Sequence, residues 1–323
     1  MTSSLPVSDR SPLEAVQAVR SEVSKVVMGQ DGVVSGLIAA LLVRGHVLLE
    51  GVPGVAKTLV VKTLGEALDL DVKRVQFTPD LMPSDVLGQL VLDPSGDFHF
   101  RQGPVFTNVL IADEINRTPP KTQAALLESM EERQVSGDGV TRPLPVPFIV
   151  IATQNPIEYE GTYPLPEAQL DRFLFKLEVG YPSAEQELEV VGRHDAGFDP
   201  HDIRGAGVEA VATKADLDAG RRELVDLRVE EAVRRYIVDL ARATREHPAV
   251  LLGVSPRGAA AHLHAAKAWA WLSGRSFVTP DEVKTVAAPA LRHRLLIRPE
   301  LELDGVTPES VLETVLSSTP APR

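Results

Sequence analysis

The chain has no cysteine, and this absence removes several kinds of chemistry at once. Without thiols there is no disulfide framework, no cysteine nucleophile and no cysteine-ligated zinc site. There is also no apolar run near the roughly 18 residues that a membrane-spanning helix needs, and the stretch from Met1 to Arg10 is too polar for a signal peptide. We therefore expect a soluble cytoplasmic protein.

Basic residues are also fewer than acidic ones. The sequence has 33 lysines and arginines against 45 acidic residues, which gives a formal net charge of -12. Such a balance disfavours a surface built to neutralise nucleic-acid phosphates, although a local basic groove is compatible with it. What the chain does have is 323 residues, 44% of them hydrophobic, which is enough for two folded domains.

The most informative segment is glycine-rich and follows the apolar run Val47 to Leu49. The next residues place apolar side chains at helical spacing, so the pattern predicts a strand, a phosphate-binding loop and a helix. Glycines let backbone N–H groups close around a polyphosphate at a helix N-terminus. Lys57 would reach the outer phosphates, and the Thr58 hydroxyl would be a ligand of Mg²⁺. The predicted nucleotide-binding loop comprises Gly51, Val52, Pro53, Gly54, Val55, Ala56, Lys57 and Thr58.

One position departs from the usual loop pattern, because Ala56 stands where a second glycine is expected. Alanine tolerates helical dihedral angles well, so we expect the departure to be mild provided that Ala56 begins the helix.

The rest of the chain divides into a strand-rich half and a helical half. Strands are predicted at Val72 to Phe77, Val109 to Ala112, Phe148 to Ala152 and Phe173 to Val179, and all except the run from Val72 are nearly continuously apolar. With the strand before the loop they predict an α/β fold, a parallel five-stranded sheet flanked by helices. After residue 182 strands disappear, which indicates a smaller all-α domain. We assign residues 1–182 to the core with its N-terminal helix, 183–228 to a linker with helices and 229–323 to a helical lid.

Two hairpins are predicted to project from this core. One covers Leu90 to Phe100 around a turn rich in Asp, Pro and Gly, and the other lies between Arg133 and Pro147. Phe98 and Phe100 are candidates for contact with a substrate, with packing against the neighbouring helix as the alternative.

Two carboxylates follow the apolar run from Val109, at the edge of a parallel sheet where ligands bind. Asp113 is predicted to hold Mg²⁺, and Glu114 beside it suits a general base that activates water. The alternative for this pair is a loop that caps the following helix.

Several motifs in this order resemble those of AAA+ ATPases. They are the loop ending in Lys57-Thr58, Asp113-Glu114, Ala152-Thr153-Gln154-Asn155-Pro156, Leu170-Asp171-Arg172-Phe173 and Ser255-Pro256-Arg257. More narrowly, the first three resemble the MoxR family, in which an alanine at the second glycine position is ordinary. The likeness extends over about residues 25 to 300.

The resemblance implies ATP and Mg²⁺ as cofactors and gives further residues a role. Asn155 matches the first sensor, which orients the attacking water, and Arg172 matches the arginine finger that acts on a neighbouring subunit's nucleotide. An ion pair of Arg172 with Asp171 is the alternative. Arg257 matches the second sensor, at the start of a lid helix where an anion is expected nearby. Gly29 and Gln30 match the segment that brackets adenine.

The resemblance also implies a homo-oligomeric, hexameric ring that remodels, activates or matures a client protein, such as one with a von Willebrand factor A domain. A nucleic-acid-translocating motor and a magnesium-chelatase-like subunit are the alternatives. Nucleic acid is disfavoured because the second hairpin offers one arginine, Arg142, against nearby acids. A late basic cluster, Arg292, His293, Arg294 and Arg298, indicates either a solvated helix end or a contact with a subunit or an acidic client.

Overall fold

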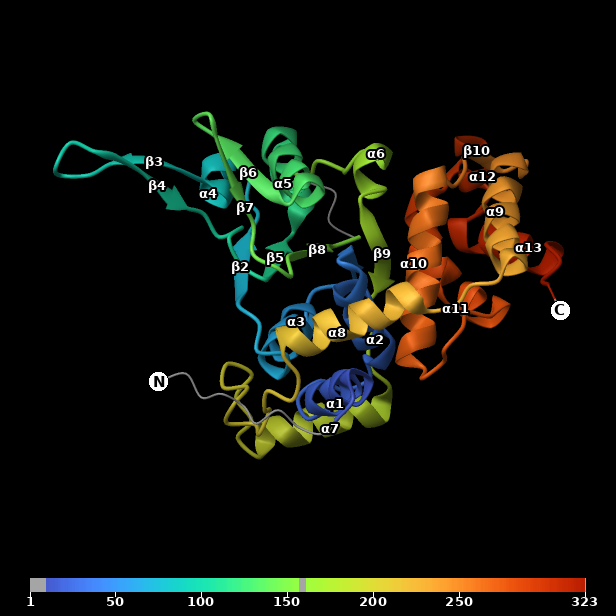
Figure 1. Ribbon diagram of the computed structural model, residues 1–323, viewed down its shortest axis with the longest axis horizontal. Helices are drawn as coiled ribbons and strands as arrows, with labels where there is room; N and C mark the ends of the chain where they lie inside the picture. Colours follow the sequence, from blue (N-terminus) through green and yellow to red (C-terminus); the bar gives the residue numbers. More distant parts are fainter. Residues whose placement is uncertain (1–9, 157–160, 323) are drawn as a thin grey trace.

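A computed structural model describes residues 10–156 and 161–322 of the chain. The polar stretch at the start therefore lies outside the described residues as far as residue 9. Figure 1 shows a strand-rich part with two projecting hairpins beside a helical part that ends at the C-terminus. In the described residues, no helix combines the length and apolarity that crossing a membrane requires.

The strand-rich part is built on one five-stranded sheet whose neighbouring strands are all parallel. Its predicted strands are present, with ends within two residues of the expected ones. In spatial order they are β2 (Val72–Gln76), β5 (Val109–Asp113), β8 (Ile149–Gln154), β1 (His46–Glu50) and β9 (Phe173–Glu178).

Both faces of this sheet are buried, because alternate residues of the three inner strands, β5, β8 and β1, enter different cores. Val47 and Ile111 belong to a large core, whereas Leu48 and Leu110 belong to a second core on the opposite face. Strand β2 is the exception: it lies at the edge of the sheet and is only partly buried. Its weaker apolar pattern therefore has a structural cause.

The large core is covered by helices from both halves of the chain. Side-chain hydroxyls cap several helices: Ser11 caps α1, Ser183 caps α7, Ser255 caps α10 (Pro256–Leu272) and Thr279 caps α11 (Pro280–Leu291). The helices on this side are α1 (Pro12–Ser24), α2 (Asp31–Val43), α3 (Lys57–Ala67), α7 (Ala184–Asp195) and α8 (Lys214–Asp226).

The second core lies beneath two helices and the bases of the hairpins. The first hairpin extends far from the sheet in Figure 1, and the second lies beside it. These elements are α4 (Pro83–Leu87), β3 (Gly88–Leu92), β4 (Phe98–Gln102), a 3-10 turn η1 (Ile115–Arg117), α5 (Pro120–Glu132), β6 (Gln134–Gly137), β7 (Val140–Pro143) and α6 (Glu167–Leu170).

The C-terminal part is helical, but the expectation that strands disappear after residue 182 is wrong in one detail. Strands β10 (Val250–Leu252) and β11 (Leu296–Ile297) form a short antiparallel pair. The helices are α9 (Glu231–Glu246), α10 (Pro256–Leu272), α11 (Pro280–Leu291), η2 (Arg292–Arg294), α12 (Pro299–Leu303) and α13 (Pro308–Ser318). Its apolar residues join the large core, and its helices α10 and α11 pack against α2 and β9.

Candidate functional site

The glycine-rich loop connects β1 to α3, as predicted, and two of its glycines have steric reasons. A Cβ on Gly51 would lie 2.5 Å from the carbonyl oxygen of Val179, and Gly54 has a φ of +88°. The expectation for Ala56 is wrong, because this residue has φ 61° and ψ 20°, a left-handed conformation that precedes the helix. Alanine therefore carries backbone strain where a glycine would carry none.

This loop borders a cavity of about 460 Å³ that collects most of the predicted nucleotide-binding and hydrolytic residues. Strand ends supply its other wall, since β5 and β8 both end at the same edge of the sheet. The lining residues are Pro53, Gly54, Val55, Ala56, Lys57, Thr58, Leu59, Arg74, Asp113, Glu114, Thr153, Gln154, Asn155 and Pro200.

Lys57 and Thr58 open α3 with an ammonium group and a hydroxyl beside this cavity. The Nζ atom of Lys57 donates to the carbonyl oxygen of Val52 at 2.9 Å and also to that of Gly51. The loop carbonyls therefore hold the Lys57 ammonium group. An anion bound to the loop amides would lie close to this charge.

Asp113 ends β5 and is almost fully buried. Its Oδ2 atom accepts hydrogen bonds from Arg74 on the neighbouring strand β2, at 2.9 Å from Nε and 2.6 Å from Nη2. Its Oδ1 atom accepts a hydrogen bond from Thr153 on the other neighbouring strand, β8, at 2.5 Å. The carboxylate is thus oriented from both sides.

Glu114 follows at once but turns toward different partners. Its backbone is left-handed, with φ 56°, and its amide donates to the Thr153 hydroxyl at 2.9 Å. Its carboxylate accepts a hydrogen bond from Gln76 at 2.6 Å and lies 3.3 Å from Nε of Arg117. Adjacent in sequence, Asp113 and Glu114 therefore occupy separate environments at the mouth of one cavity.

A second cavity of about 510 Å³ adjoins the first and is mostly apolar. The two share Pro53, Gly54, Val55, Ala56 and Leu59 of the loop and α3. The other lining residues are Val26, Val27, Met28, Gln30, Tyr181, Pro182, Glu187, Val190, Val191, Arg193, His194 and Phe198. An apolar slot beside a phosphate loop suits a planar base.

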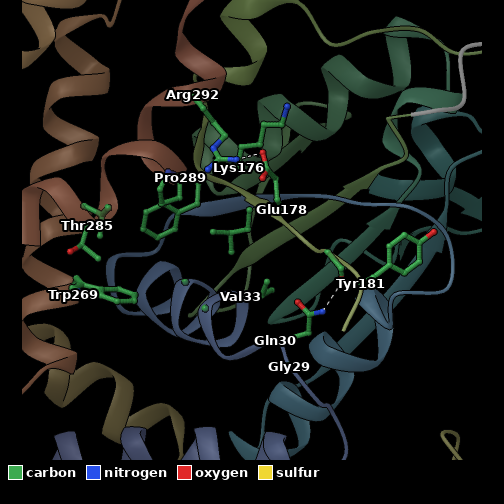
Figure 2. A pocket seen from close by; sticks show the side chains of 16 residues that line it. Gly29, Gln30, Val33, Lys176, Glu178, Tyr181, Trp269, Thr285, Pro289 and Arg292 are labelled. Carbon is green, nitrogen blue, oxygen red and sulfur yellow. Dashed lines mark hydrogen bonds and ion pairs between the residues drawn. The ribbon is translucent and has the colours of Figure 1, made fainter. Parts of the chain in front are cut away.

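Gln30 lines both this apolar cavity and a third cavity of about 440 Å³, whereas Gly29 lines only the third. Figure 2 shows Gln30 and Tyr181 at one end of that third cavity and Arg292 with Glu178 at the other. The Gln30 amide donates to the carbonyl oxygen of Gly180 at 3.0 Å, which joins the start of α2 to the end of β9. The Gly29–Gln30 pair therefore lies together at the third cavity, and only Gln30 also borders the apolar one.

Arg172 and Arg257 line none of these cavities. Arg172 precedes β9 at the opposite edge of the sheet and donates to the carbonyl oxygen of Leu127 at 2.6 Å. Arg257 starts α10 and forms an ion pair with Glu131 at 2.6 Å. The expected anion near Arg257 is thus a side chain of α5, and the ion pair of Arg172 with Asp171 does not form.

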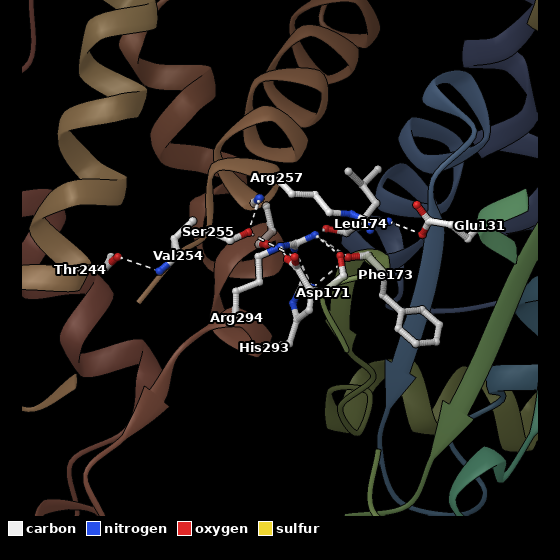
Figure 3. A network of polar contacts seen from close by, with 12 residues as sticks. Glu131, Asp171, Phe173, Leu174, Thr244, Val254, Ser255, Arg257, His293 and Arg294 are labelled. Carbon is white, nitrogen blue, oxygen red and sulfur yellow. Dashed lines mark hydrogen bonds and ion pairs between the residues drawn. The ribbon is translucent and has the colours of Figure 1, made fainter. Parts of the chain in front are cut away.

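Asp171 instead pairs with Arg294, whose side chain is 2% exposed, at 2.7 Å. Figure 3 shows this pair between the carbonyl oxygens of β9 and the start of α10. Arg294 also donates to the carbonyl oxygen of Phe173 at 2.7 Å, and His293 contacts the same oxygen at 3.0 Å. The expectation of a solvated or intersubunit cluster is therefore wrong for His293 and Arg294, which are buried.

Three residues around the first cavity, Arg74, Gln76 and Thr153, have no predicted role. Each contacts Asp113 or Glu114 from a strand next to β5. The sequence does not show which strands are neighbours in the sheet. Arg74 and Gln76 do leave a signal, because they alternate on the strand with the weakest apolar pattern.

The ammonium, hydroxyl and carboxylate groups at one cavity, with an apolar slot beside it, fit a nucleoside triphosphate and Mg²⁺. Comparisons with known proteins point the same way. Residues 46–175 match the model of the ATPase family associated with various cellular activities (AAA), and residues 242–315 match an AAA lid domain.

Individual relatives cover nearly the whole chain. It is 43% identical to chaperone MoxR1 of Mycobacterium tuberculosis over 94% of this chain and 81% of that protein. It is 47% identical to the protein YeaC of Bacillus subtilis over 93% and 92% of the two chains. A crystal structure from Cytophaga hutchinsonii, 41% identical, superposes with a TM-score of 0.88 over 97% of this chain and 96% of that one.

Proposed function

The chain belongs to the MoxR family of AAA+ ATPases, and on that premise we propose that it hydrolyses ATP as a ring to remodel or mature a client protein. One observation carries the proposal. Lys57, Thr58, Asp113, Glu114 and Asn155 line a single cavity, and an apolar cavity of the right character for adenine adjoins it.

In the proposed complex, Lys57 leaves the loop carbonyls and binds the outer phosphates, while Thr58 and Asp113 hold Mg²⁺. The ion supplies charge neutralisation of the phosphate oxygens when it is bound. Asp113 can take this role after exchanging its contact with Arg74. Asn155, which is 5% exposed at the tip of β8, orients the attacking water.

Glu114 acts as the general base for that water. Its carboxylate is engaged by Gln76 and Arg117 at the start, so it must move away from these donors to accept a proton. Rotation about its own side chain is sufficient for this, because the backbone is fixed by Thr153.

The positions of the arginines relative to the loop support the proposed ring. Strand β1 separates the two edges of the sheet by five residues, or about 16 Å, which is more than an arginine side chain spans. Arg172 and Arg257 therefore suit the nucleotide of a neighbouring copy better than their own. A finger of this kind can contribute about a thousandfold or more in rate. A hexamer is the ring size that we propose.

The first hairpin supports a protein client. Phe98 is 70% exposed near its tip, and Leu92 opposite it is 56% exposed. Together they offer an apolar face that a protein segment can cover, for example from a client with a von Willebrand factor A domain.

A DNA-translocating motor is the weaker proposal. Arg142, the arginine of the second hairpin, lies 3.8 Å over the ring of Phe100 and donates to the carbonyl oxygens of Gly137 and Val140. Its guanidinium is therefore already engaged. Salt-sensitive stimulation of the ATPase by DNA would favour the motor.

The direct test compares Lys57→Ala and Glu114→Gln with the unmodified protein. Lys57→Ala is expected to lose binding of a fluorescent ATP analogue. Glu114→Gln is expected to keep that binding and to lower phosphate release by about a hundredfold or more. Equal turnover by Glu114→Gln and the unmodified protein would remove Glu114 from the mechanism, and absence of nucleotide binding by the unmodified protein would overturn the proposal. The ATP-loaded Glu114→Gln form is also the bait of choice for a client.

A further inference from the structure

Arginines gather at the amino edge of the sheet, although the chain as a whole carries a net charge of -12. Arg44 lies just before β1 and Arg172 just before β9, and His46 pairs with Phe173 in the register of these adjacent strands. Arg133 ends α5, close to the Glu131 that pairs with Arg257. We call Arg44, Arg133, Arg172 and Arg257 the basic band.

The members of the basic band lie close enough to influence one another. Burial lowers the pKa of Arg133, the charge of Arg44 lowers it further, and the nearby Glu131 carboxylate acts in the opposite direction. Arg257, through its hydrogen bond, and Arg172 both lower the pKa of the Glu131 carboxyl. Four arginines therefore lie around one carboxylate, Glu131, in the region from Arg44 to Arg257.

Arg44 and Arg133 have little to neutralise them. The nearest carboxylate to Arg44 is that of Asp218 at 3.6 Å, and this group already pairs with Arg221 at 2.6 Å. The Nε atom of Arg44 is buried without a hydrogen-bond partner. Within residues 10–156 and 161–322, the Arg133 guanidinium makes neither an ion pair nor a hydrogen bond.

The backbone at both positions is also unfavourable for arginine. Arg44 has φ 55° and Arg133 has φ 53°, at the ends of α2 and α5, where glycine is the usual residue. A cation is favourable at a helix C-terminus, but these arginines combine left-handed backbones with mutual repulsion. Groups held against such penalties are typical of functional sites.

We propose that Arg44 and Arg133 bind the phosphate chain of the nucleotide held by a neighbouring copy, next to Arg172. Guanidinium groups match phosphate oxygens with paired N–H donors, and the Arg44 side chain is 31% exposed. The inference rests on the proposed ring, and it adds two residues that contact the substrate.

Glycine substitutions allow a test in which a loss of activity cannot be explained by a less stable protein. Arg44→Gly and Arg133→Gly remove the guanidinium and relieve the left-handed backbone, so their resistance to urea should equal or exceed that of the unmodified protein. Phosphate release per assembled chain should fall about tenfold or more, as expected for a lost charged hydrogen bond. The matched control is Arg242→Ala on the lid surface, where the arginine lies 3.8 Å from Glu246, and it should leave turnover unchanged.

A mixing experiment shows whether the arginines act between copies. Lys57→Ala, which keeps the basic band, is combined at low concentration with Arg44→Gly, which keeps the nucleotide loop, and the mixture is then concentrated. Phosphate release above the sum of the two parents supports the proposal.

Three other outcomes would contradict either the role of Arg44 or the proposed function. A mixture no better than the sum, with an active unmodified protein, overturns the role of Arg44 and leaves the ATPase intact. Loss of nucleotide-free assembly by Arg44→Gly, measured by light scattering, also overturns it, because the band would then contact protein carboxylates. An unmodified protein without phosphate release contradicts the proposed function itself.

Discussion

Ala56 holds a left-handed conformation at the start of α3, with φ 61°. Glycine adopts this conformation without the penalty of about 1 kcal/mol that a Cβ brings. We expect Ala56→Gly to raise the free energy of unfolding by up to about 1 kcal/mol in urea titrations. The same exchange at Ala124, exposed within α5, should lower it by about 1 kcal/mol. Changes of the same sign at both positions would contradict the strain at Ala56.

The nucleotide loop and Asp113-Glu114 are predictable from the sequence because each is a local pattern. The roles of Arg74, Gln76 and Thr153 are not, because they depend on β2 and β8 lying on either side of β5. The left-handed backbone of Ala56 is likewise invisible to a motif, since alanine itself favours helical angles.

At the scale of elements, the first hairpin has two phenylalanines with different environments. Phe98 is 70% exposed, whereas Phe100 packs edge-on against Phe106 at 6.0 Å between ring centroids and lies under Arg142. We expect Phe98→Ala to change the free energy of unfolding by less than about 0.5 kcal/mol, and Phe100→Ala to lower it by about 1–2 kcal/mol.

The functional effect of the two substitutions is expected to be the reverse. Phe98→Ala should keep basal phosphate release while weakening the capture of a client, because its ring is free to meet one. Thermal unfolding and client capture by the Glu114→Gln form, with and without Phe98→Ala, measure the two effects. Equal stability losses at both positions would contradict the separation.

The five strands of the sheet and the capped helices are predictable because their apolar periodicity and capping residues are local. Strands β10 and β11 are too short, at three and two residues, to show any period. The burial of Arg294 was also missed, because its partner Asp171 lies 123 residues away in the sequence. A basic run is normally solvated, and here a distant carboxylate and strand carbonyls change that outcome.

At the scale of the whole molecule, buried histidines make stability depend on pH. Burial lowers the pKa of His46 and of His262 to about 4, and it lowers that of His293 well below the usual value. His46 accepts from the amide of Val150 at 2.9 Å and donates to the carbonyl oxygen of Met130 at 3.2 Å, as a neutral ring does.

Because the pKa values of His46 and His262 are depressed on folding, the stability that these two residues confer is complete above about pH 6.5 and is lost as the pH falls toward 4. We expect protonation of His46 and of His262 in the unfolded chain to lower the free energy of unfolding by about 2 kcal/mol each between pH 7 and pH 5. Urea titrations at the two pH values measure this difference. His262→Gln should reduce it and the exposed His201→Gln should not, so an equal pH dependence in both variants would contradict the assignment.

At the scale of the whole molecule, the glycine-rich loop and the basic band lie at opposite edges of one sheet, and the proposed function therefore makes hydrolysis a property of the proposed assembly. The most direct measurement is phosphate release per chain over a wide range of protein concentration, with assembly followed by light scattering. The account predicts a low rate for dilute single chains and a steep rise as rings form. A rate per chain that stays constant while the protein is monomeric throughout would contradict it.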